Sequence, residues 1–385
     1  MRYNYIWLRS SQHCLYLDDV FCSNQFVKKK NSMDAGKIRE TFSKRNFLQS
    51  ILFYDMIFNL VLDKLPTTAQ WVQNGITVAG SATGESGSSL NRLRRNVGVY
   101  CADDDILYIA DANNNRTILI ALSSTTALAV AGGAAQPYML SFPTDLFVTR
   151  TSVYVMDTGN FRVLKWSRDF VDPVTVAGIS GVKGDAANMM ALSNSYNLFV
   201  DNYGNLFVSD ADNHRVMRFP WSSKNGTNGT MVAGTGISGS NTNQLNEPKG
   251  IFVTDKGILY ITDCNNHRIQ KWIISTSSGV TVAGTSVAGR DLSQLAFPRT
   301  VLVDSNEYMY ITDYGNDRIM RWAPGASAGE CIVACSGTRG INSNQLAGPI
   351  SMTFDSTGSL YVSEYDNNRV QKFQILDETS IKSHP

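Results

Sequence analysis

The chain has 385 residues, with 34 Lys and Arg, 33 Asp and Glu, and a formal net charge of +1. Because 43% of its residues are hydrophobic, it can bury a large core, which excludes a chain that is disordered throughout. The near-neutral charge argues against nucleic acid as an obligate partner, since phosphate binding usually leaves a basic footprint.

The first 70 residues share no pattern with the remainder, so we predict a separate N-terminal segment at 1–70. It contains a mostly apolar stretch at 47–62, which is shorter than the about 20 residues that span a bilayer and is interrupted by Asp55. Three alternatives stay open for this stretch. It packs as a helix against the rest of the chain, it contacts a membrane as an anchor or signal-like segment, or it is an unstructured leader.

A single motif then recurs six times. Each copy is an apolar-aromatic-apolar run followed by an acid, by Asn three positions after the acid, and by Arg five positions after it. The acids are 46, 53, 53, 50 and 51 residues apart. The acid and arginine of each copy are Asp111 and Arg116, Asp157 and Arg162, Asp210 and Arg215, Asp263 and Arg268, Asp313 and Arg318, and Glu364 and Arg369.

Each repeat also holds four short β-rich runs separated by Gly, Asn, Asp and Ser, and helical periodicity is missing from 71 to 375. Four strands in about 50 residues, repeated six times, are typical of a propeller with one sheet per repeat. We therefore predict an all-β, six-bladed β-propeller with four-stranded blades at 71–375, followed by a tail at 376–385.

The motif has a structural interpretation. The acid ends the second strand, Asn permits the tight turn, and Arg opens the third strand. We expect a bidentate ion pair between acid and Arg to hold that turn. A large apolar residue nine positions after each acid is expected to fill the space between neighbouring sheets: Ile120, Trp166, Phe219, Trp272, Trp322 and Phe373.

The phase of the repeat predicts how the ring closes. A Val-Ala-Gly signature marks the fourth strand at 78–80, 130–132, 176–178, 232–234 and 282–284, with 333–335 as a sixth copy that has Cys335 in the glycine slot. The first copy precedes any complete repeat, and the last repeat ends near Ile375 without one. Residues 71–80 are therefore predicted to supply the outer strand of the sixth blade.

The run from Tyr260 to Trp272 and the Gln-Leu-x-x-Pro lead-ins at 244–248 and 294–298 resemble the NHL repeat. The resemblance covers about four-fifths of the chain. It implies two known kinds of activity. Peptide-amidating lyases, which are similar in fold, hold zinc through histidines in the central channel. Ubiquitin-ligase-type proteins use the propeller to recognise protein or RNA. Four positions depart from the pattern: Glu364 replaces Asp, Asn96 and Ser195 replace Pro, and Cys335 replaces Gly.

Neither activity gains support from the residues. The chain has four histidines, and no three of them fall on inner strands, so no catalytic residue, metal site or cofactor is predicted. We interpret Asp145 and Asp201 as turn residues rather than as calcium ligands. Two Cys and one His in residues 1–70 are too few for a RING or B-box domain.

A ligand site on a propeller is expected where one blade departs from the others, and the six motif turns are expected to share one face. The rim candidates are His214, His267, Tyr314, Asp317, Tyr365 and Asp366. We favour a monomeric, non-enzymatic binding scaffold with a protein partner. The alternatives are a lyase or hydrolase with a channel metal site, and an RNA-binding or ubiquitin-ligase-associated module; nucleic acid is disfavoured but not excluded.

Cysteines and sequons bear on the compartment. Cys331 and Cys335 lie four residues apart in a strand-like segment, which would separate them by ~13 Å and prevent a disulfide. Cys14 and Cys22 could pair, but nothing requires it. Cysteine usage therefore leaves the compartment open.

Three Asn-x-Thr sequons are present. Asn225 and Asn228 lie in a polar loop and are predicted glycosylation sites if the chain is secreted, whereas Asn115 lies in a repeat turn and is expected to be less accessible. The sequons favour an extracellular or membrane-anchored location over a cytoplasmic one.

Overall fold

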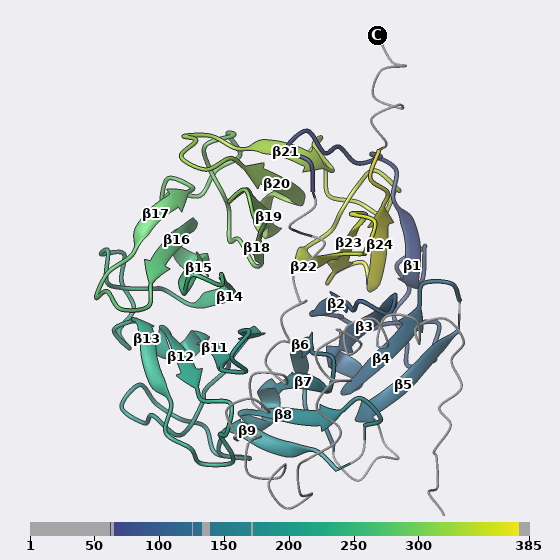
Figure 1. Ribbon diagram of the computed structural model, residues 1–385. Coiled ribbons are helices and arrows are strands. Elements are labelled where there is room, and N and C mark those ends of the chain that lie inside the picture. Colours follow the sequence, from purple (N-terminus) through teal and green to yellow (C-terminus); the bar gives the residue numbers. More distant parts are fainter. Residues whose placement is uncertain (1–61, 63–64, 125, 133–138, 171, 377–385) are drawn as a thin grey trace, which may run out of the picture. The chain divides into compact units, whose positions relative to one another are not determined.

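The computed structural model describes residues 62, 65–124, 126–132, 139–170 and 172–376, all of them within one compact unit, Asp55–Pro385. These residues form six four-stranded antiparallel sheets, arranged as blades around a central axis (Figure 1). The predicted six-bladed all-β propeller is thereby confirmed. The apolar stretch at 47–62 lies outside the described residues except for Leu62.

The first three blades follow one another along the chain. Blade 1 consists of β2 (Val99–Cys101), β3 (Ile106–Asp111), β4 (Arg116–Ala121) and β5 (Ala127–Gly132). Blade 2 consists of β6 (Pro143–Val148), β7 (Ser152–Asp157), β8 (Arg162–Ser167) and β9 (Val174–Gly178). Blade 3 consists of β10 (Leu198–Val200), β11 (Leu206–Asp210), β12 (Arg215–Phe219) and β13 (Thr230–Gly234).

The remaining blades have the same order of strands, from the channel outward. Blade 4 consists of β14 (Pro248–Val253), β15 (Ile258–Asp263), β16 (Arg268–Ile273) and β17 (Val280–Ala283). Blade 5 consists of β18 (Val301–Val303), β19 (Met309–Asp313), β20 (Arg318–Trp322) and β21 (Glu330–Val333). Blade 6 consists of β22 (Pro349–Phe354), β23 (Leu360–Glu364), β24 (Arg369–Phe373) and β1 (Ile76–Gly80).

Blade 6 closes the ring as the phase of the repeat predicts. Its strand order is β1-β24-β23-β22, so a strand from the start of the propeller completes the last sheet. Trp71 continues this pairing by bridging to Ile375, and its side chain is 2% exposed. The indole Nε1 donates a hydrogen bond of 2.9 Å to the carbonyl of Gly358. The closing segment is therefore part of the core.

The blades pack through the expected large apolar side chains. All six residues nine positions after the motif acids are buried, and Phe219, Trp272, Trp322 and Phe373 are at most 2% exposed. Within each blade the motif acid lies directly opposite the motif Arg across the hairpin of the second and third strands, as in the pair Asp210 and Arg215. Both features follow from the alternation of side chains along a strand.

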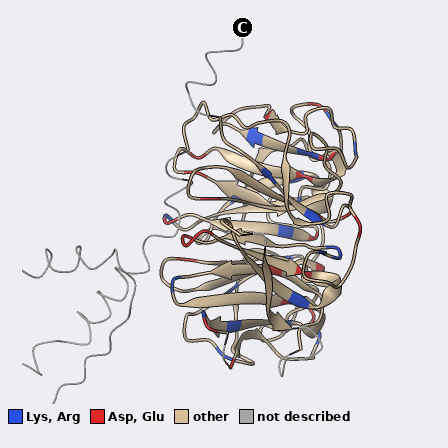
Figure 2. Ribbon diagram, turned by 90° about the vertical axis from the view of Figure 1, so that its right-hand side faces the viewer, with Lys and Arg blue, Asp and Glu red and all other residues tan. Residues whose placement is uncertain are grey.

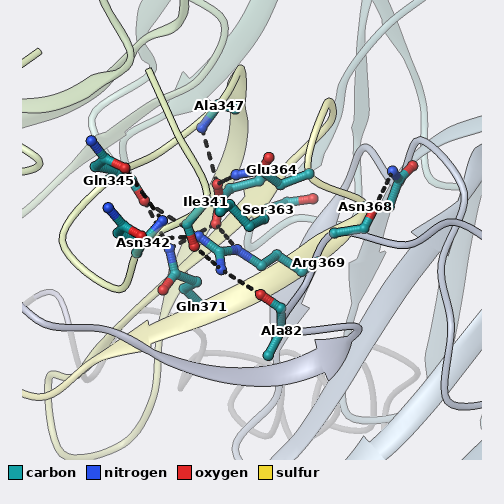
Figure 3. Close-up of polar contacts among 12 residues, drawn as sticks. Ala82, Ile341, Asn342, Gln345, Ala347, Ser363, Glu364, Asn368, Arg369 and Gln371 are labelled. Carbon is teal, nitrogen blue, oxygen red and sulfur yellow. Dashed lines mark hydrogen bonds and ion pairs between the residues drawn. The ribbon is translucent and has the colours of Figure 1, made fainter. Parts of the chain in front are cut away.

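The motif residues form a buried clamp rather than a surface feature. In blade 6, one oxygen of Glu364 accepts a hydrogen bond of 3.0 Å from the backbone N–H of Ala347 (Figure 3). The same oxygen accepts a second one, of 2.6 Å, from Nδ2 of Asn367. Its other oxygen accepts from Nε of Arg369 at 2.7 Å. The terminal nitrogens of Arg369 donate to backbone carbonyls, including that of Ile341 at 2.8 Å. The clamp thus ties the turn to the connection between blades.

The same geometry recurs in all six blades, with the Arg Nε 2.7–2.8 Å from the acid. The predicted bidentate ion pair is therefore wrong, because a single guanidinium nitrogen meets the carboxylate. The other nitrogens are needed for carbonyl groups of the connecting loop, which would otherwise lack partners. Burial raises the pKa of five of the six acids, and the hydrogen bonds from Asn, backbone and Arg oppose that effect: Asp111, Asp157, Asp263, Asp313 and Glu364.

Blade 5 departs from the others at the end of its outer strand. Ile319 pairs with Val333, just as Ile269 pairs with Ala283 in blade 4. Ala334 therefore occupies the position of Gly284, and it has a φ of 54°. The assignment of Cys335 to the glycine slot is wrong by one residue, because the pattern of apolar residues alone does not specify the register of the strand pairing.

Cys331 and Cys335 form a disulfide with a Cα–Cα distance of 5.5 Å. The prediction that they lie too far apart is wrong. It assumed a continuous strand, whereas β21 ends at Val333 and the left-handed Ala334 reverses the chain between the two cysteines. The disulfide therefore lies at the end of the outer strand of blade 5, the blade in which alanine replaces the glycine.

We expect Ala334→Gly to stabilise the propeller by about 0.5–1 kcal/mol, because alanine is disfavoured at a positive φ. The matched change Gly284→Ala should destabilise it by about 1–3 kcal/mol. Its Cβ would lie 2.4 Å from the carbonyl oxygen of His267. Urea unfolding of both variants measures the two changes in the free energy of unfolding. If both substitutions stabilised the protein, or both destabilised it, this explanation of the glycine position would be contradicted.

Candidate binding site

The six motif turns lie on one face of the propeller, because neighbouring strands are antiparallel and each turn joins the second and third strands. We call this the turn face. The hairpins between the first and second strands, including the turn at 254–257, lie on the opposite face. On the turn face, the residue before each motif Arg has a left-handed φ of 50–55°: Asn115, Phe161, His214, His267, Asp317 and Asn368.

Two of the six rim candidates, His214 and His267, join neighbouring blades. Their Nδ1 atoms accept hydrogen bonds of 3.2 Å from the backbone N–H groups of Glu247 and Phe297, each of which begins the next blade. Burial lowers the pKa of His267, which favours the neutral ring that this acceptor role requires. The structure thus gives both histidines a partner within the protein.

The other four rim candidates come together at blades 5 and 6 around an arginine that the sequence did not single out. Arg339 contacts Asp366 at 2.6 Å and Asp317 at 3.3 Å, and its side chain is 53% exposed. Asp317 also accepts the backbone N–H of Gly348 at 2.8 Å, so it is a blade-joining residue as well. Tyr314 and Tyr365 are the residues that directly follow the motif acids of these blades, and both are partly exposed.

Two inner cations, Lys249 and Arg299, lie against tyrosine rings where the inner strands begin on the turn face. The guanidinium carbon of Arg299 lies 4.6 Å from the ring centroid of Tyr314 and 5.6 Å from that of Tyr196. Lys249 Nζ lies 4.1 Å from the centroid of Tyr196, and Arg95 stacks on Tyr365 at 5.3 Å. Such contacts stabilise a cation that has lost part of its hydration.

Both inner cations are short of anionic partners. The Lys249 side chain is 7% exposed, and its ion pair is to the half-exposed Glu247 at 3.3 Å. Burial, reinforced by the charge of Arg299, lowers the pKa of Lys249. The Nε of Arg299 is buried and has no hydrogen-bond partner among the described residues. We name Tyr196, Lys249, Arg299, Tyr314 and Tyr365 the channel mouth.

Below the channel mouth, all six inner strands and Leu62 line a cavity of about 110 Å³. Asp145 lies on β6, is 5% exposed and faces this cavity. The interpretation of Asp145 as a turn residue is therefore wrong, whereas Asp201 does cap a turn by accepting the backbone N–H groups of Tyr203 and Asn205. Burial raises the pKa of Asp145 to about 7.

The comparisons with known proteins agree with this architecture. The family model described as NHL repeat matches residues 245–272 and 346–373, within blades 4 and 6. A human protein, NHL repeat-containing protein 3, is 28% identical over 150 residues. That match covers 34% of this chain and 40% of the human protein. Blades 4 and 6 therefore carry NHL repeats within a six-bladed β-propeller.

Solved structures similar to this NHL propeller have low sequence identity, so they show the fold alone. An auxiliary nutrient binding protein from Bacteroides thetaiotaomicron is 16% identical with a TM-score of 0.57, over 80% of this chain and 78% of that one. A gluconolactonase from Xanthomonas campestris is 12% identical with a TM-score of 0.54, over 81% of this chain and 99% of that one. Binding proteins and enzymes thus share the architecture.

Within the part of the NHL propeller that the structure describes, no three His, Cys, Asp or Glu side chains are grouped so that they could hold a metal ion. None of its described helices is long and apolar enough to cross a membrane. Figure 2 shows Lys and Arg interspersed with Asp and Glu on the flank that faces the viewer. A continuous basic stripe, which nucleic-acid binding favours, is not visible on that flank.

Sequence reasoning missed Lys249, Arg299 and Tyr196, although the repeat contains the pattern that finds them. All three directly follow the position that is proline in four of the six blades, at or just before the start of an inner strand: Pro143, Pro248, Pro298 and Pro349, with Asn96 and Ser195 in the other two. The other blades of the NHL propeller have Val97, Thr144 and Ile350 there. Comparing this slot between blades would have identified the two cations, by the same logic that selected the rim candidates in the turns.

The ionisation of Asp145 should make the stability of the NHL propeller depend on pH. Its folded-state pKa is about 7, raised from 3.8, so the folded state binds the proton more tightly than the unfolded state. The stabilising effect of the protonated carboxyl is complete below pH 4 and is lost as the pH rises through 7.

We therefore expect Asp145→Asn to raise stability at pH 8 by about 2 kcal/mol and to have little effect at pH 4. A tenfold change in an ionisation constant is worth about 1.4 kcal/mol, and a carboxylate that faces a cavity is less desolvated than one in dry protein. Urea unfolding at the two pH values measures the difference. A gain that is the same at both would contradict the raised pKa.

Proposed function

We propose that this propeller is a non-enzymatic binding scaffold whose turn face recognises a protein partner through a carboxylate placed at the channel mouth. The observation that carries the proposal is the pair of cations Arg299 and Lys249, which have one acidic ion-pair partner between them among the described residues, the half-exposed Glu247. A partly buried cation that is short of counterions gains more from a ligand carboxylate than a fully hydrated cation does.

The surrounding side chains suit a protein interface. Tyr and Arg are enriched at the centres of interfaces, because they contribute large contact areas. Tyr196, Tyr314 and Tyr365 provide such areas, and each stacks with a cation. The exposed Arg339 with its two carboxylates lies beside them and is suited to select partners by charge.

The extent of the surface favours a protein over a metabolite. Its residues come from blade 3 (Tyr196), blade 4 (Lys249), blade 5 (Arg299 and Tyr314) and blade 6 (Tyr365). A protein loop with an Asp, a Glu or a C-terminal carboxylate can contact all of them.

A selection from a random peptide library on the immobilised full chain tests this proposal. We expect the selected peptides to be enriched in Asp and Glu, and Arg299→Met to weaken their binding at least about tenfold. Tyr203→Ala is the control, because Tyr203 is 67% exposed and lies on the opposite face. Peptides without acidic enrichment, or equal binding to both variants, would overturn it.

The alternatives give different results. Stoichiometric zinc or calcium in the purified protein, together with turnover, would establish an enzyme. Binding of an RNA pool that weakens steeply as salt is raised would establish an RNA-binding module. Either outcome contradicts the protein-binding scaffold.

We also propose an extracellular or membrane-anchored location. The Cys331–Cys335 disulfide supports an oxidising compartment, and the sequon residues Asn225 and Asn228 are both exposed. Asn115 is exposed too, but its side-chain oxygen accepts the backbone N–H of Phe142. Expression through a secretory pathway should give a glycosidase-sensitive protein, and Asn225→Gln with Asn228→Gln should remove that sensitivity; a glycan-free secreted chain would contradict the predicted sites.

A further inference from the structure

A second site lies inside the channel, apart from the proposed protein-binding surface. Its central group is Asp145, whose Oδ2 accepts hydrogen bonds from Nδ2 of Asn197 at 2.6 Å and from the backbone N–H of Leu198 at 3.0 Å. Among the residues that the structure describes, no Lys, Arg or His forms an ion pair with it. Ionisation of a buried carboxylate without a cation is costly, and a cation bound beside it would offset that cost.

Joining blades does not require that charge. At the same position in the next blade, Asn197 accepts the backbone N–H of Ile251 at 2.9 Å with a neutral amide oxygen. In blade 6, Ser351 accepts the backbone N–H of Val99 at 3.3 Å with a hydroxyl. Neutral side chains therefore serve the structural role, so joining the blades does not require a carboxyl group at position 145.

The cavity beside Asp145 has an aromatic wall. Tyr100, Phe147, Phe199 and Phe252 occupy one position in four consecutive blades, with neighbouring ring centroids 5.1–5.2 Å apart. We call these four residues the aromatic arc. Blades 5 and 6 have Leu302 and Thr353 at this position. The arc and Asp145 line the same cavity.

We propose that this channel cavity binds a small primary ammonium ion, with Asp145 as its counterion and the aromatic arc around its alkyl part. A carboxylate and aromatic faces are the two groups that attract an organic cation in a partly desolvated site. The hydroxyls of Thr300 and Ser351 line the cavity as well and can accept further ammonium N–H groups.

The size of the cavity limits the ligand. Its volume is about 110 Å³, whereas an apolar cavity of roughly 150 Å³ holds benzene. An ammonium with a short alkyl chain fits this space. The site therefore differs from the proposed protein-binding surface in place, in charge and in ligand size.

Calorimetric titration of the full chain at pH 8 tests the proposal with n-butylammonium chloride and with n-butanol as its neutral analogue. We expect saturable binding of n-butylammonium and a roughly 10- to 100-fold weaker affinity in Asp145→Asn, since a charge-assisted contact is lost. Because the asparagine can keep the blade-joining acceptor, the variant should remain folded, which a thermal melt checks. Its affinity for n-butanol should be unchanged.

Phe199→Leu provides a second variant that keeps the carboxylate and changes the aromatic arc. We expect it to weaken n-butylammonium binding about three- to tenfold. Arg218→Met, on the exposed side of β12, is the matched control and should bind like the natural chain. Failure of the natural chain to bind n-butylammonium, or equal affinity in Asp145→Asn, would overturn the proposal and would leave the peptide selection at the channel mouth unaffected.

Discussion

Deletion of residues 71–80 is expected to abolish cooperative folding of the propeller. This segment contains β1, which pairs with β24 along four residue pairs, and Trp71, which bridges to Ile375. Without it, blade 6 would have three strands and β24 would become an open edge with unpaired backbone groups. The loss should appear in a thermal melt as a missing or strongly lowered transition, and an unchanged melting temperature would contradict this closure.

A point substitution at Trp71 tests how much side-chain packing alone contributes to the stability of this closure. Trp71 contacts Tyr310 and Phe354 with ring centroids 6.0 and 5.9 Å away, and the guanidinium of Arg321 lies 5.8 Å from its ring. Trp71→Ala should therefore cost about 3–5 kcal/mol. Ile76→Ala, in β1 but 66% exposed, should change stability by less than about 0.5 kcal/mol.

Arg215→Met is expected to destabilise the propeller by about 3–5 kcal/mol, because it would leave Asp210 buried without its cation. Both side chains of this pair are 0% exposed, and Nε lies 2.8 Å from the carboxylate. The terminal nitrogens also donate at 2.7 Å to the carbonyls of Ala186 and Asn188, so the connection from blade 2 would lose two hydrogen bonds.

The control for this prediction lies three residues further along the same strand. Arg218 on β12 is exposed, so Arg218→Met should change the free energy of unfolding by less than about 0.5 kcal/mol. Denaturant unfolding followed by tryptophan fluorescence compares the two variants. If both changes had the same small effect, the motif arginine would not be a structural clamp.

Repetition made the fold predictable and also marked where prediction would fail. The motif spacing predicts six blades, their four strands and the closure by residues 71–80. It failed at the end of blade 5, where the Cys331–Cys335 disulfide depends on a single left-handed residue, Ala334. A backbone angle of this kind depends on the neighbouring turn and not on local composition.

The candidate site was predictable only in part. Tyr314, Asp317, Tyr365 and Asp366 were found because they depart from the repeat, and the structure brings them together around Arg339. His214 and His267 depart from it as well, yet they accept backbone hydrogen bonds from the next blade. Whether any of the six contacts a ligand stays a prediction.

By itself, the sequence determined the blade count, the buried clamp residues and the seam of the ring, because each depends on a pattern that recurs in phase along the chain. Only the tertiary structure decided which side chains meet across the central axis. Lys249 and Arg299 at the channel mouth are 50 residues apart in the chain, and Asp145 beside the aromatic arc precedes Lys249 by 104 residues. Closure of the ring brings these side chains together, and a local sequence pattern cannot predict that proximity.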